Sequence, residues 1–463
     1  MPNDSIMANN RRTFLELATL AWPMVISQGA FAVMIFTDRY FMSLISPTHI
    51  SAAMAGGVTF YCCISLLIGT VSFTNTLVSR SFGAGRRAAC SRILNQALLI
   101  TLLAWPPLLL LGSFVAEGFN HVGHDPEQVQ LEQTYFRILL LGSLFGAGRV
   151  AFASWFTGIG RTRVVMIADL TCMAFNIPIT WLLVFGLPGA GVPALGIAGA
   201  AWATLIASGL SLLIYFGFYL HAGNRQAFQV RLSLRPDREI LGQFLRLGLP
   251  SGTEMFLNVS AFNLFLIMFQ SYGVTAGAAA AIVFNWDILC FIPMMGLNHS
   301  VNSLVGRYLG AGNETATSRV IASGFIMGLA WSGCMAVLFL TQRDTLIGVF
   351  LQGSAADDAI TALAWPMMAG LATYAMADAI ILVAGGVLRG AGDTRWLMIT
   401  SVALHWLMVV GQVLTIHVWE LDPLISWFVL VAMIISIALA YALRLLGPAW
   451  RRAGAAAFQV QTG

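Results

Sequence analysis

Twelve long apolar segments constrain this chain more than any other feature of its sequence. A transmembrane helix needs roughly 20 apolar residues, and 58% of the 463 residues are hydrophobic while only 10% are charged. A β-barrel would show short alternating strands in place of such continuous runs. The sequence therefore predicts an all-α integral membrane protein. Its twelve helices are expected near residues 14–40, 54–78, 93–116, 133–157, 164–187, 196–221, 243–270, 276–305, 318–341, 361–388, 396–418 and 424–446.

The distribution of arginine predicts the orientation of these helices. All 24 basic residues are Arg, and cytoplasmic loops carry an excess of basic residues. If residues 1–13 lie in the cytoplasm, the Arg-rich connections fall inside and the Arg-poor segments 117–133, 342–359 and 417–424 fall outside. We therefore expect a multi-pass protein of the bacterial inner membrane, with the tails 1–13 and 448–463 both cytoplasmic. The arginines need no nucleic-acid partner to explain them.

An internal repeat divides the predicted helices into two sets of six. VSRSFGAGRRAACSR (78–92) aligns with VGRYLGAGNETATSR (305–319) at an offset of 227 residues, and Pro23 and Pro250 keep the same offset. FTGIGRTR (156–163) aligns with LRGAGDTR, which begins 232 residues later. The GAG turns are typical of helix C-terminal caps.

Because six is an even number, the two sets have the same orientation, as in transporters built from parallel repeats. We expect an N-terminal lobe over 14–222 and a C-terminal lobe over 241–447, joined by a cytoplasmic linker at 223–240. These pseudo-symmetric lobes are expected to enclose a central cleft.

Acidic residues inside the apolar segments are the strongest functional signal. Glu254, Asp287 and Asp378 lie well inside predicted helices, Asp38 lies nearer an outer end, and Asp169 is a fifth. A charge at the centre of the bilayer costs about 2.5–3.5 kcal/mol, so the first three together oppose insertion by about 8–10 kcal/mol. Their helices offer no Arg at adjacent helical spacing, which favours protons or metal cations as partners of this trio.

Tyr374 and Asp378 are four residues apart and share one face of a helix. A hydroxyl and a carboxylate oxygen suit a hard cation such as Na⁺, whereas a lone carboxyl group in a low dielectric suits H⁺. The sequence leaves the choice between Na⁺ and H⁺ open, as it leaves open that Tyr374 only packs in the core.

Several motifs in order resemble the multidrug and toxic compound extrusion (MATE) family of the multidrug/oligosaccharidyl-lipid/polysaccharide flippase superfamily. They are Pro23 with Asp38 at the far end of the first helix, the R-x-x-G-A-G turn, and Y-x-x-x-D-A at 374–379. The resemblance implies that Tyr374 and Asp378 belong to a cation site of the C-terminal lobe. The family's glutamate eight residues after the helix-seven proline is Asn258 here, and Glu254 comes one turn earlier.

In the N-terminal lobe, Asp38 and Asn176 match family positions linked to cation binding. Thr180 replaces the acid expected four residues after the asparagine, which weakens a complete second site. The possible secondary site residues are polar or charged residues inside the predicted helices of both lobes. They are Asn258, Asn285, Asn176, Thr180, Asp169 and Arg149.

Together these features predict a monomeric secondary antiporter that exports small organic cations in exchange for Na⁺ or H⁺ by alternating access, without a cofactor. A flippase for a lipid-linked or polysaccharide substrate is the alternative, favoured by the mid-helix Arg149. An enzyme is disfavoured because no H-E-x-x-H or G-x-S-x-G context occurs. The absence of any lysine excludes a Walker A site, and with it pumping driven by ATP.

Three local alternatives remain open at this point. Arg149 could pair with Asp38 or with Asp169. Asp38 could form an interfacial ion pair with Arg39, and Asp169 could pair with Arg163 at the end of its helix.

Overall fold

The computed structural model describes residues 2–121, 123–187, 189, 191–230, 233, 235–351 and 357–458. Within this part of the chain every regular element is helical, apart from one isolated bridge between Leu187 and Val192. Twelve of the described helical spans are long and apolar enough to cross a membrane, which confirms the predicted fold class.

The first half of the chain contains α1 (Pro2–Ser43), α2 (Pro47–Ser72), α3 (Thr74–Gly83), α4 (Arg87–Gly118), α5 (Pro126–Gly158), α6 (Thr162–Phe185), α7 (Gly196–Leu220) and α8 (Ala222–Ala227). The second half contains α9 (Arg238–Gln243), a π-helix (Phe244–Gly248), α10 (Leu249–Gln270), α11 (Val274–Gly310), α12 (Glu314–Thr341), α13 (Arg343–Gly348), α14 (Asp357–Ala391), α15 (Thr394–Val413), a second π-helix (Leu414–Val418), α16 (Pro423–Leu446) and α17 (Ala449–Phe458).

The repeated glycine turns fold alike. Gly85 and Gly312 have φ of +75° and +69°, a conformation that glycine adopts without penalty. After each, the next residue donates its backbone N–H to a carbonyl five residues earlier, Arg86 to Ser81 and Asn313 to Tyr308, both at 2.9 Å. This is the bonding of a Schellman cap. The second repeated turn has the same pattern around Gly160 and Gly392. The predicted helix caps are therefore confirmed.

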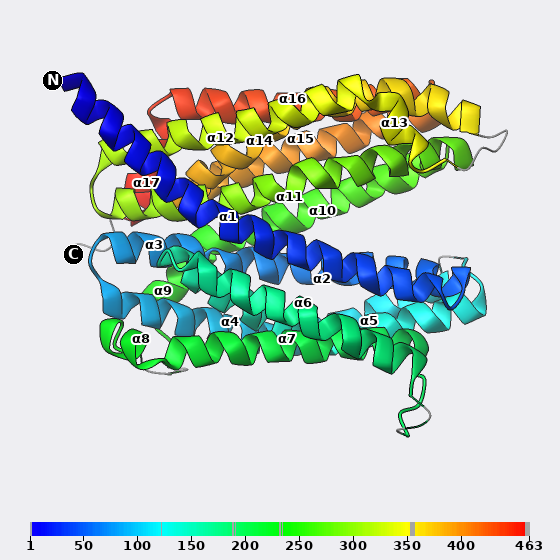
Figure 1. Ribbon diagram of the computed structural model, residues 1–463, viewed down its shortest axis with the longest axis horizontal. Helices are drawn as coiled ribbons and strands as arrows, with labels where there is room; N and C mark the ends of the chain where they lie inside the picture. Colours follow the sequence, from blue (N-terminus) through cyan, green and yellow to red (C-terminus); the bar gives the residue numbers. More distant parts are fainter. Residues whose placement is uncertain are drawn as a thin grey trace. The chain divides into compact units, whose positions relative to one another are not determined.

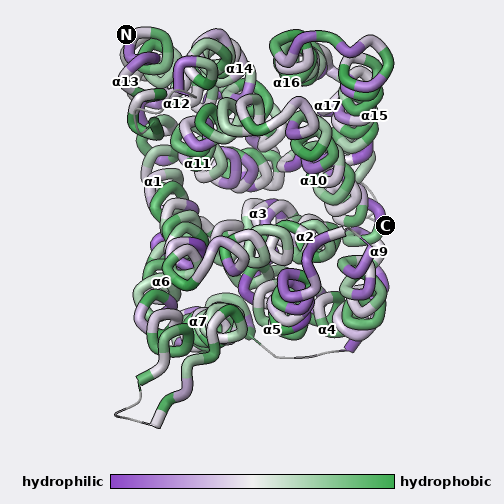
Figure 2. Tube along the Cα trace, turned by 90° about the vertical axis from the view of Figure 1, so that its right-hand side faces the viewer, coloured by the Kyte–Doolittle hydropathy of each residue, from purple (hydrophilic) through white to green (hydrophobic). Residues whose placement is uncertain are grey.

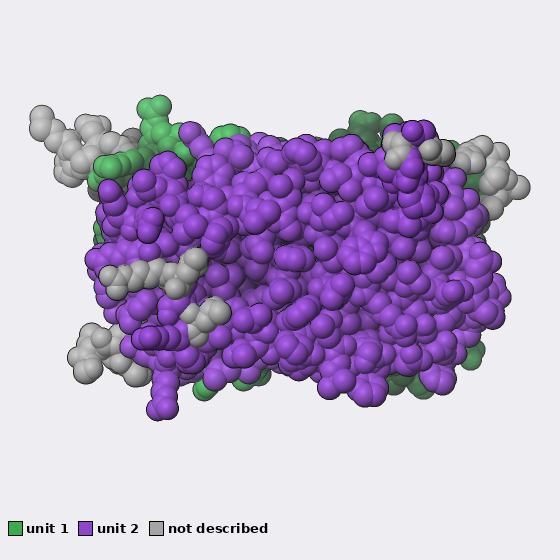
Figure 3. Space-filling model, turned by 90° about the horizontal axis from the view of Figure 1, so that it is seen from below, with its two compact units in different colours: residues 1–25, 257–463 green, residues 26–256 purple. Residues whose placement is uncertain are grey.

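The chain forms two compact units, shown as ribbons in Figure 1 and in separate colours in Figure 3. One unit contains residues 26–256, and the other contains residues 1–25 with 257–463. The divisions therefore lie inside α1 and α10, whereas the predicted lobes met at the linker 223–240.

Close helix packing explains where the units divide. At Gly296 of α11, an added Cβ would lie 2.6 Å from the backbone nitrogen of Val25, so the first half of α1 belongs with the second half of the chain. At Gly252 of α10, an added Cβ would lie 2.3 Å from the carbonyl oxygen of Leu66 on α2. Small residues allow this approach between membrane helices, and each unit includes the first part of a helix from the other half of the sequence.

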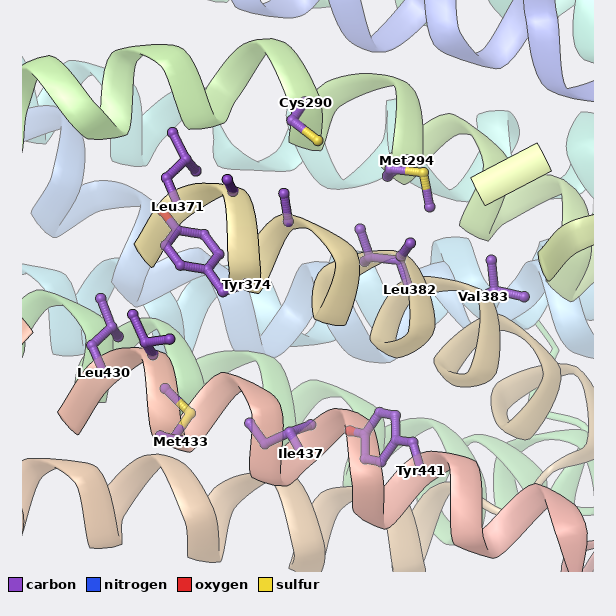
Figure 4. Packing of buried hydrophobic residues seen from close by; sticks show 14 of the residues in the cluster. Cys290, Met294, Leu371, Tyr374, Leu382, Val383, Leu430, Met433, Ile437 and Tyr441 are labelled. Atoms are coloured by element: carbon purple, nitrogen blue, oxygen red, sulfur yellow. The ribbon is translucent and has the colours of Figure 1, made fainter. Parts of the chain in front are cut away.

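Helix α14 forms the centre of its unit. In its most apolar stretch, 72% of the residues are buried, more than in any other described span. Figure 4 shows it packed between α11 and α16, with Leu371, Tyr374 and Val383 in the shared core. Because α14 is the most buried span, a polar residue on it is surrounded largely by protein. In both units, green, hydrophobic stretches follow the helices in Figure 2.

Candidate functional site

Two acids and a tyrosine of the C-terminal half come together between α11 and α14. Asp287 lies on α11, and Tyr374 and Asp378 lie one turn apart on α14. The two carboxylates interact electrostatically with each other and with the hydroxyl of Tyr374. Both acids are half-buried, while Tyr374 is 1% exposed. Three of the predicted coupling residues thus form one group within a single unit, and we call Asp287, Tyr374 and Asp378 the α11–α14 acid group.

The α11–α14 acid group has unused hydrogen-bonding capacity. The Tyr374 hydroxyl and the Oδ1 atom of Asp287 are buried without a hydrogen-bond partner. None of the ion pairs in the described part of the chain involves Asp287 or Asp378. A buried polar atom left unsatisfied costs about 1–3 kcal/mol. The group therefore has the open oxygen atoms that a proton or a small hard cation would occupy.

The ring of Tyr374 also has a packing role. It lies 6.4 Å from the ring of Trp427 on α16, measured between centroids, in a tilted arrangement. Figure 4 shows it within the same core as Leu430 and Met433. Packing accounts for the ring and leaves its hydroxyl available. Among the described residues, no cluster of three or more His, Cys, Asp or Glu side chains could hold a metal ion.

The remaining candidates of the C-terminal half have other surroundings. Glu254 is buried, but it belongs to the unit of residues 26–256, so its grouping with Asp287 and Asp378 stays a prediction. Asn258 donates its amide to the hydroxyl of Ser401 at 2.7 Å. Asn285 is exposed and donates to the Ala281 carbonyl of its own helix, so the structure does not bring it into the acid group.

In the N-terminal half, Asp38 accepts two hydroxyl hydrogen bonds, from Thr180 at 3.2 Å and from Thr204 at 3.1 Å. Asn176 lies one turn before Thr180 on the same face of α6. It is fully buried, and neither of its amide atoms has a hydrogen-bond partner. Arg39 is exposed whereas Asp38 is buried, so the alternative of an Asp38–Arg39 ion pair is wrong. Adjacent helical residues point in different directions, which separates the two side chains.

Asp169 lies in a second polar cluster of the same unit. Its Oδ1 atom is 2.9 Å from Nη1 of Arg149 and accepts a hydrogen bond from the hydroxyl of Tyr215 at 3.1 Å. Its Oδ2 atom accepts from Ser27. This settles the partner of Arg149 as Asp169 and corrects the alternative of a pair with Arg163, because both carboxylate oxygens contact Arg149, Tyr215 and Ser27 instead.

Sequence reasoning missed Thr204, Ser27 and Tyr215. Thr204 could have been noticed as a polar residue in the very apolar stretch 196–220. Nothing in the sequence pairs Ser27 or Tyr215 with Asp169, because they lie on three helices far apart along the chain.

Comparison with known proteins identifies the family. The sequence matches the profile of the MatE family over residues 23–182 and 250–414, which is well over half of the chain. The chain belongs to the MatE family. This confirms the resemblance found in the motifs, and as a MatE protein it is a transporter and not an enzyme.

Curated MatE relatives cover nearly the whole chain. It is 26% identical over 434 residues to the probable multidrug resistance protein NorM of Chromobacterium violaceum, covering 92% of this chain and 91% of the relative. It is 27% identical over 422 residues to the multidrug resistance protein PmpM of Pseudomonas aeruginosa, covering 89% and 86%.

Solved structures share the fold at low sequence identity. A MOP superfamily transporter from Pyrococcus furiosus matches with a TM-score of 0.85 at 18% identity, covering 96% of each chain. The eukaryotic MATE transporter AtDTX14 matches with a TM-score of 0.86 at 16% identity, covering 97% of this chain and 99% of that one.

Proposed function

We propose that this MatE protein exports multiple drugs, chiefly organic cations, in exchange for Na⁺ or H⁺. The observation that carries the proposal is the α11–α14 acid group, two interacting carboxylates and an unbonded hydroxyl inside one unit. The names of the relatives, which describe multidrug resistance, support drugs as the substrate class.

The chemistry of the acid group supports coupling to a small cation. Two carboxylates that interact in a low-dielectric interior cannot both remain charged without a counter-charge. A bound Na⁺ or H⁺ supplies that charge, and its release to the other side restores the pair for an organic cation. Ion and substrate then compete for one negative site, which is the requirement for exchange.

The membrane potential gives this exchange its direction. The two carboxylates take up two such cations for each singly charged substrate that is released, so one net positive charge moves inward in each cycle. Through 100 mV that net charge gains about 2.3 kcal/mol, which corresponds to roughly a fiftyfold concentration ratio. Reorientation between two conformations of the transporter then exposes the site to each side in turn. No nucleotide and no cofactor is needed.

Asp38, Thr180, Thr204 and Asn176 form a candidate second ion site in the N-terminal half. Two threonine hydroxyls already contact the carboxylate of Asp38, and the buried amide of Asn176 lies on the same face of α6 as Thr180. Oxygen atoms of these types are ligands for a hard cation. We assign this site a supporting role, because a single acid supplies its charge.

The flippase alternative loses the observation that favoured it. A site for an anionic lipid headgroup needs a cationic lining, and Arg149 was the residue that suggested one. Its guanidinium lies 2.9 Å from Asp169, so its charge is compensated within the protein.

The Arg-rich connections support an orientation with both chain ends in the cytoplasm. The bacterial origin of the relatives supports the inner membrane of a bacterium as the location. A monomer suffices for this mechanism, because each chain contains both predicted lobes.

The test is efflux of a cationic dye from proteoliposomes under an imposed Na⁺ gradient alone and then under a pH gradient alone. Asp378→Asn should abolish the dependence on whichever gradient drives efflux in the natural protein. Asp344→Asn is the matched control, since Asp344 is an exposed acid in the same unit. Full ion-driven efflux by Asp378→Asn would refute the coupling role.

A further inference from the structure

A basic pocket opens at the start of α4, within the unit of residues 26–256. Its volume is about 660 Å³, and its walls include Ser91, Asn95 and Gln96 of α4 and the segment 235–238 at the start of α9. A second hollow of about 500 Å³ continues from it over Arg86 and Arg87. Figure 1 shows α9 beside α4 in this unit.

The pocket is strongly positive. Among the lining residues that the structure describes, five are arginines and Asp237 is the one acid. The arginines are Arg86, Arg87, Arg92, Arg235 and Arg238. Asp237 lies 3.2 Å from Nη1 of Arg92, an ion pair whose Arg side chain is 62% exposed. An exposed pair of this kind contributes little stability, so the pocket keeps a clear excess of positive charge.

Buried polar side chains hold the pocket in shape. Gln96 is 2% exposed and donates its amide to the Arg235 carbonyl at 2.9 Å. The backbone N–H of Asp237 donates to Oε1 of Gln96 at 3.1 Å. One glutamine thus ties the segment before α9 to α4, and the arginines of both elements surround a common space.

The internal repeat provides a comparison for this helix start. Arg86 and Arg87 correspond to Asn313 and Glu314, which begin α12. Asn313 caps α12 by accepting the N–H of Ala316 at 3.0 Å, and Glu314 places an acid in the first turn. The start of α4 has no side-chain cap and has arginines instead. A helix N-terminus is itself partly positive. The arginines add to this charge at the start of α4, whereas Glu314 offsets it at the start of α12.

We propose that this pocket binds the phosphate group of an anionic lipid headgroup. Arginine forms paired hydrogen bonds with phosphate oxygens, and basic pockets beside membrane helices on the cytoplasmic side bind anionic headgroups. The pocket lies at the first turn of a candidate membrane span, Arg87–His121, where headgroups are found. The cytoplasmic placement rests on the proposed orientation, but binding itself is independent of transport.

Native mass spectrometry of the full-length protein tests this, with phosphatidylglycerol as the probe. Each arginine that lines the pocket and faces the bound headgroup should contribute about a fivefold factor, the value for a basic residue close to anionic lipid. Arg86→Gln/Arg87→Gln should therefore weaken phosphatidylglycerol binding about 25-fold. Arg451→Gln/Arg452→Gln removes the same charge from exposed positions of α17 and should bind as the natural protein does. Equal binding by the two double variants would overturn the proposal.

A variant that should bind phosphatidylglycerol more tightly provides a second test, because misfolding would weaken binding and could not strengthen it. Asp237 caps α9 by accepting the N–H of Ile240, a role that asparagine also fills. Asp237→Asn should therefore keep the fold and bind phosphatidylglycerol about fivefold more tightly, because one negative charge leaves the pocket. Unchanged or weaker binding by this variant would contradict the proposal.

Two further probes identify the source of the phosphate. Phosphatidylcholine, whose headgroup has no net charge, should bind weakly and without dependence on Arg86 and Arg87. Inorganic phosphate at millimolar concentration should not displace phosphatidylglycerol. If inorganic phosphate displaces the lipid and binds in an arginine-dependent way, the ligand is a soluble phosphate compound and the lipid assignment is wrong.

Discussion

The buried acids of the two units are compensated differently. Asp169 has an arginine at 2.9 Å and two hydroxyl donors. Asp287 and Asp378 interact with each other and, among the described residues, form no ion pair. A carboxylate needed only for folding is satisfied by protein groups, whereas one that exchanges a ligand must be left open. We therefore propose a structural role for the Asp169 cluster and a functional one for the α11–α14 acid group.

Removal of Arg149 tests the structural side of this comparison with the largest expected effect. Arg149→Met leaves Asp169 as an uncompensated buried charge, which should lower the free energy of unfolding by about 3–5 kcal/mol. Denaturant unfolding of the detergent-solubilised protein measures it. The double variant Arg149→Met/Asp169→Leu should lose much less, because both charges leave together. A single variant as stable as the natural protein would show that the pair is not structural.

Removal of a carboxylate from the α11–α14 acid group tests the functional side. Asp378→Asn should leave the free energy of unfolding unchanged or raise it, because no protein partner loses a contact. At the same time the substrate gradient that efflux sustains should fall by up to about fiftyfold at 100 mV, the value of one charge. Unfolding and proteoliposome efflux are measured on the same preparation. A large loss of stability with coupled efflux retained would reverse the roles assigned to the two clusters.

Asp38 is intermediate between the two cases, since hydroxyls contact it but no arginine does. Thr204→Val removes one of its two hydrogen bonds and should cost about 1.5 kcal/mol of unfolding free energy, the lower end for a bond to a charged group. Thr171→Val is the control, because the Thr171 hydroxyl bonds only to its own helix at Ile167. If both substitutions have equal effects, the Asp38 contact contributes no stability.

The repeated turns are the part of the comparison in which the two halves should behave alike. Gly85→Ala and Gly312→Ala should each cost about 1 kcal/mol, because both residues have positive φ and open space at the Cβ position. Gly217→Ala should instead stabilise α7 slightly, since that glycine is helical and equally unobstructed. Thermal unfolding of the three variants measures this. Unequal effects at Gly85 and Gly312 would show that the repeat shares sequence without sharing energetics.

Most of the fold could be predicted from the sequence, but only the local pairings of the candidate site. Apolar length placed twelve helices, and the glycine turns had the predicted caps, because both depend on residues close together along the chain. Tyr374 and Asp378 were paired by their spacing of one helical turn. Two kinds of contact depend instead on how the helices rotate about their axes when they pack. One is the interaction of this pair with Asp287, and the other is the hydrogen bonding of Asp38 by Thr180 and Thr204. That rotation is set by many side chains at once and not by any local pattern.

The sequence by itself determined the membrane class, the number of helices, the repeat and the presence of acids in apolar surroundings, since the cost of burying a charge depends only on residue type and depth. The tertiary structure decided which acids are compensated. Arg149 could equally have paired with Asp38 or Asp169, and it pairs with Asp169 because α5 and α6 bring their side chains within 2.9 Å. The tertiary structure also decided that the first parts of α1 and α10 each pack with the opposite half of the chain. Gly296 and Gly252 allow the helix backbones to come close together there, and the sequence pattern alone does not show which helices do so.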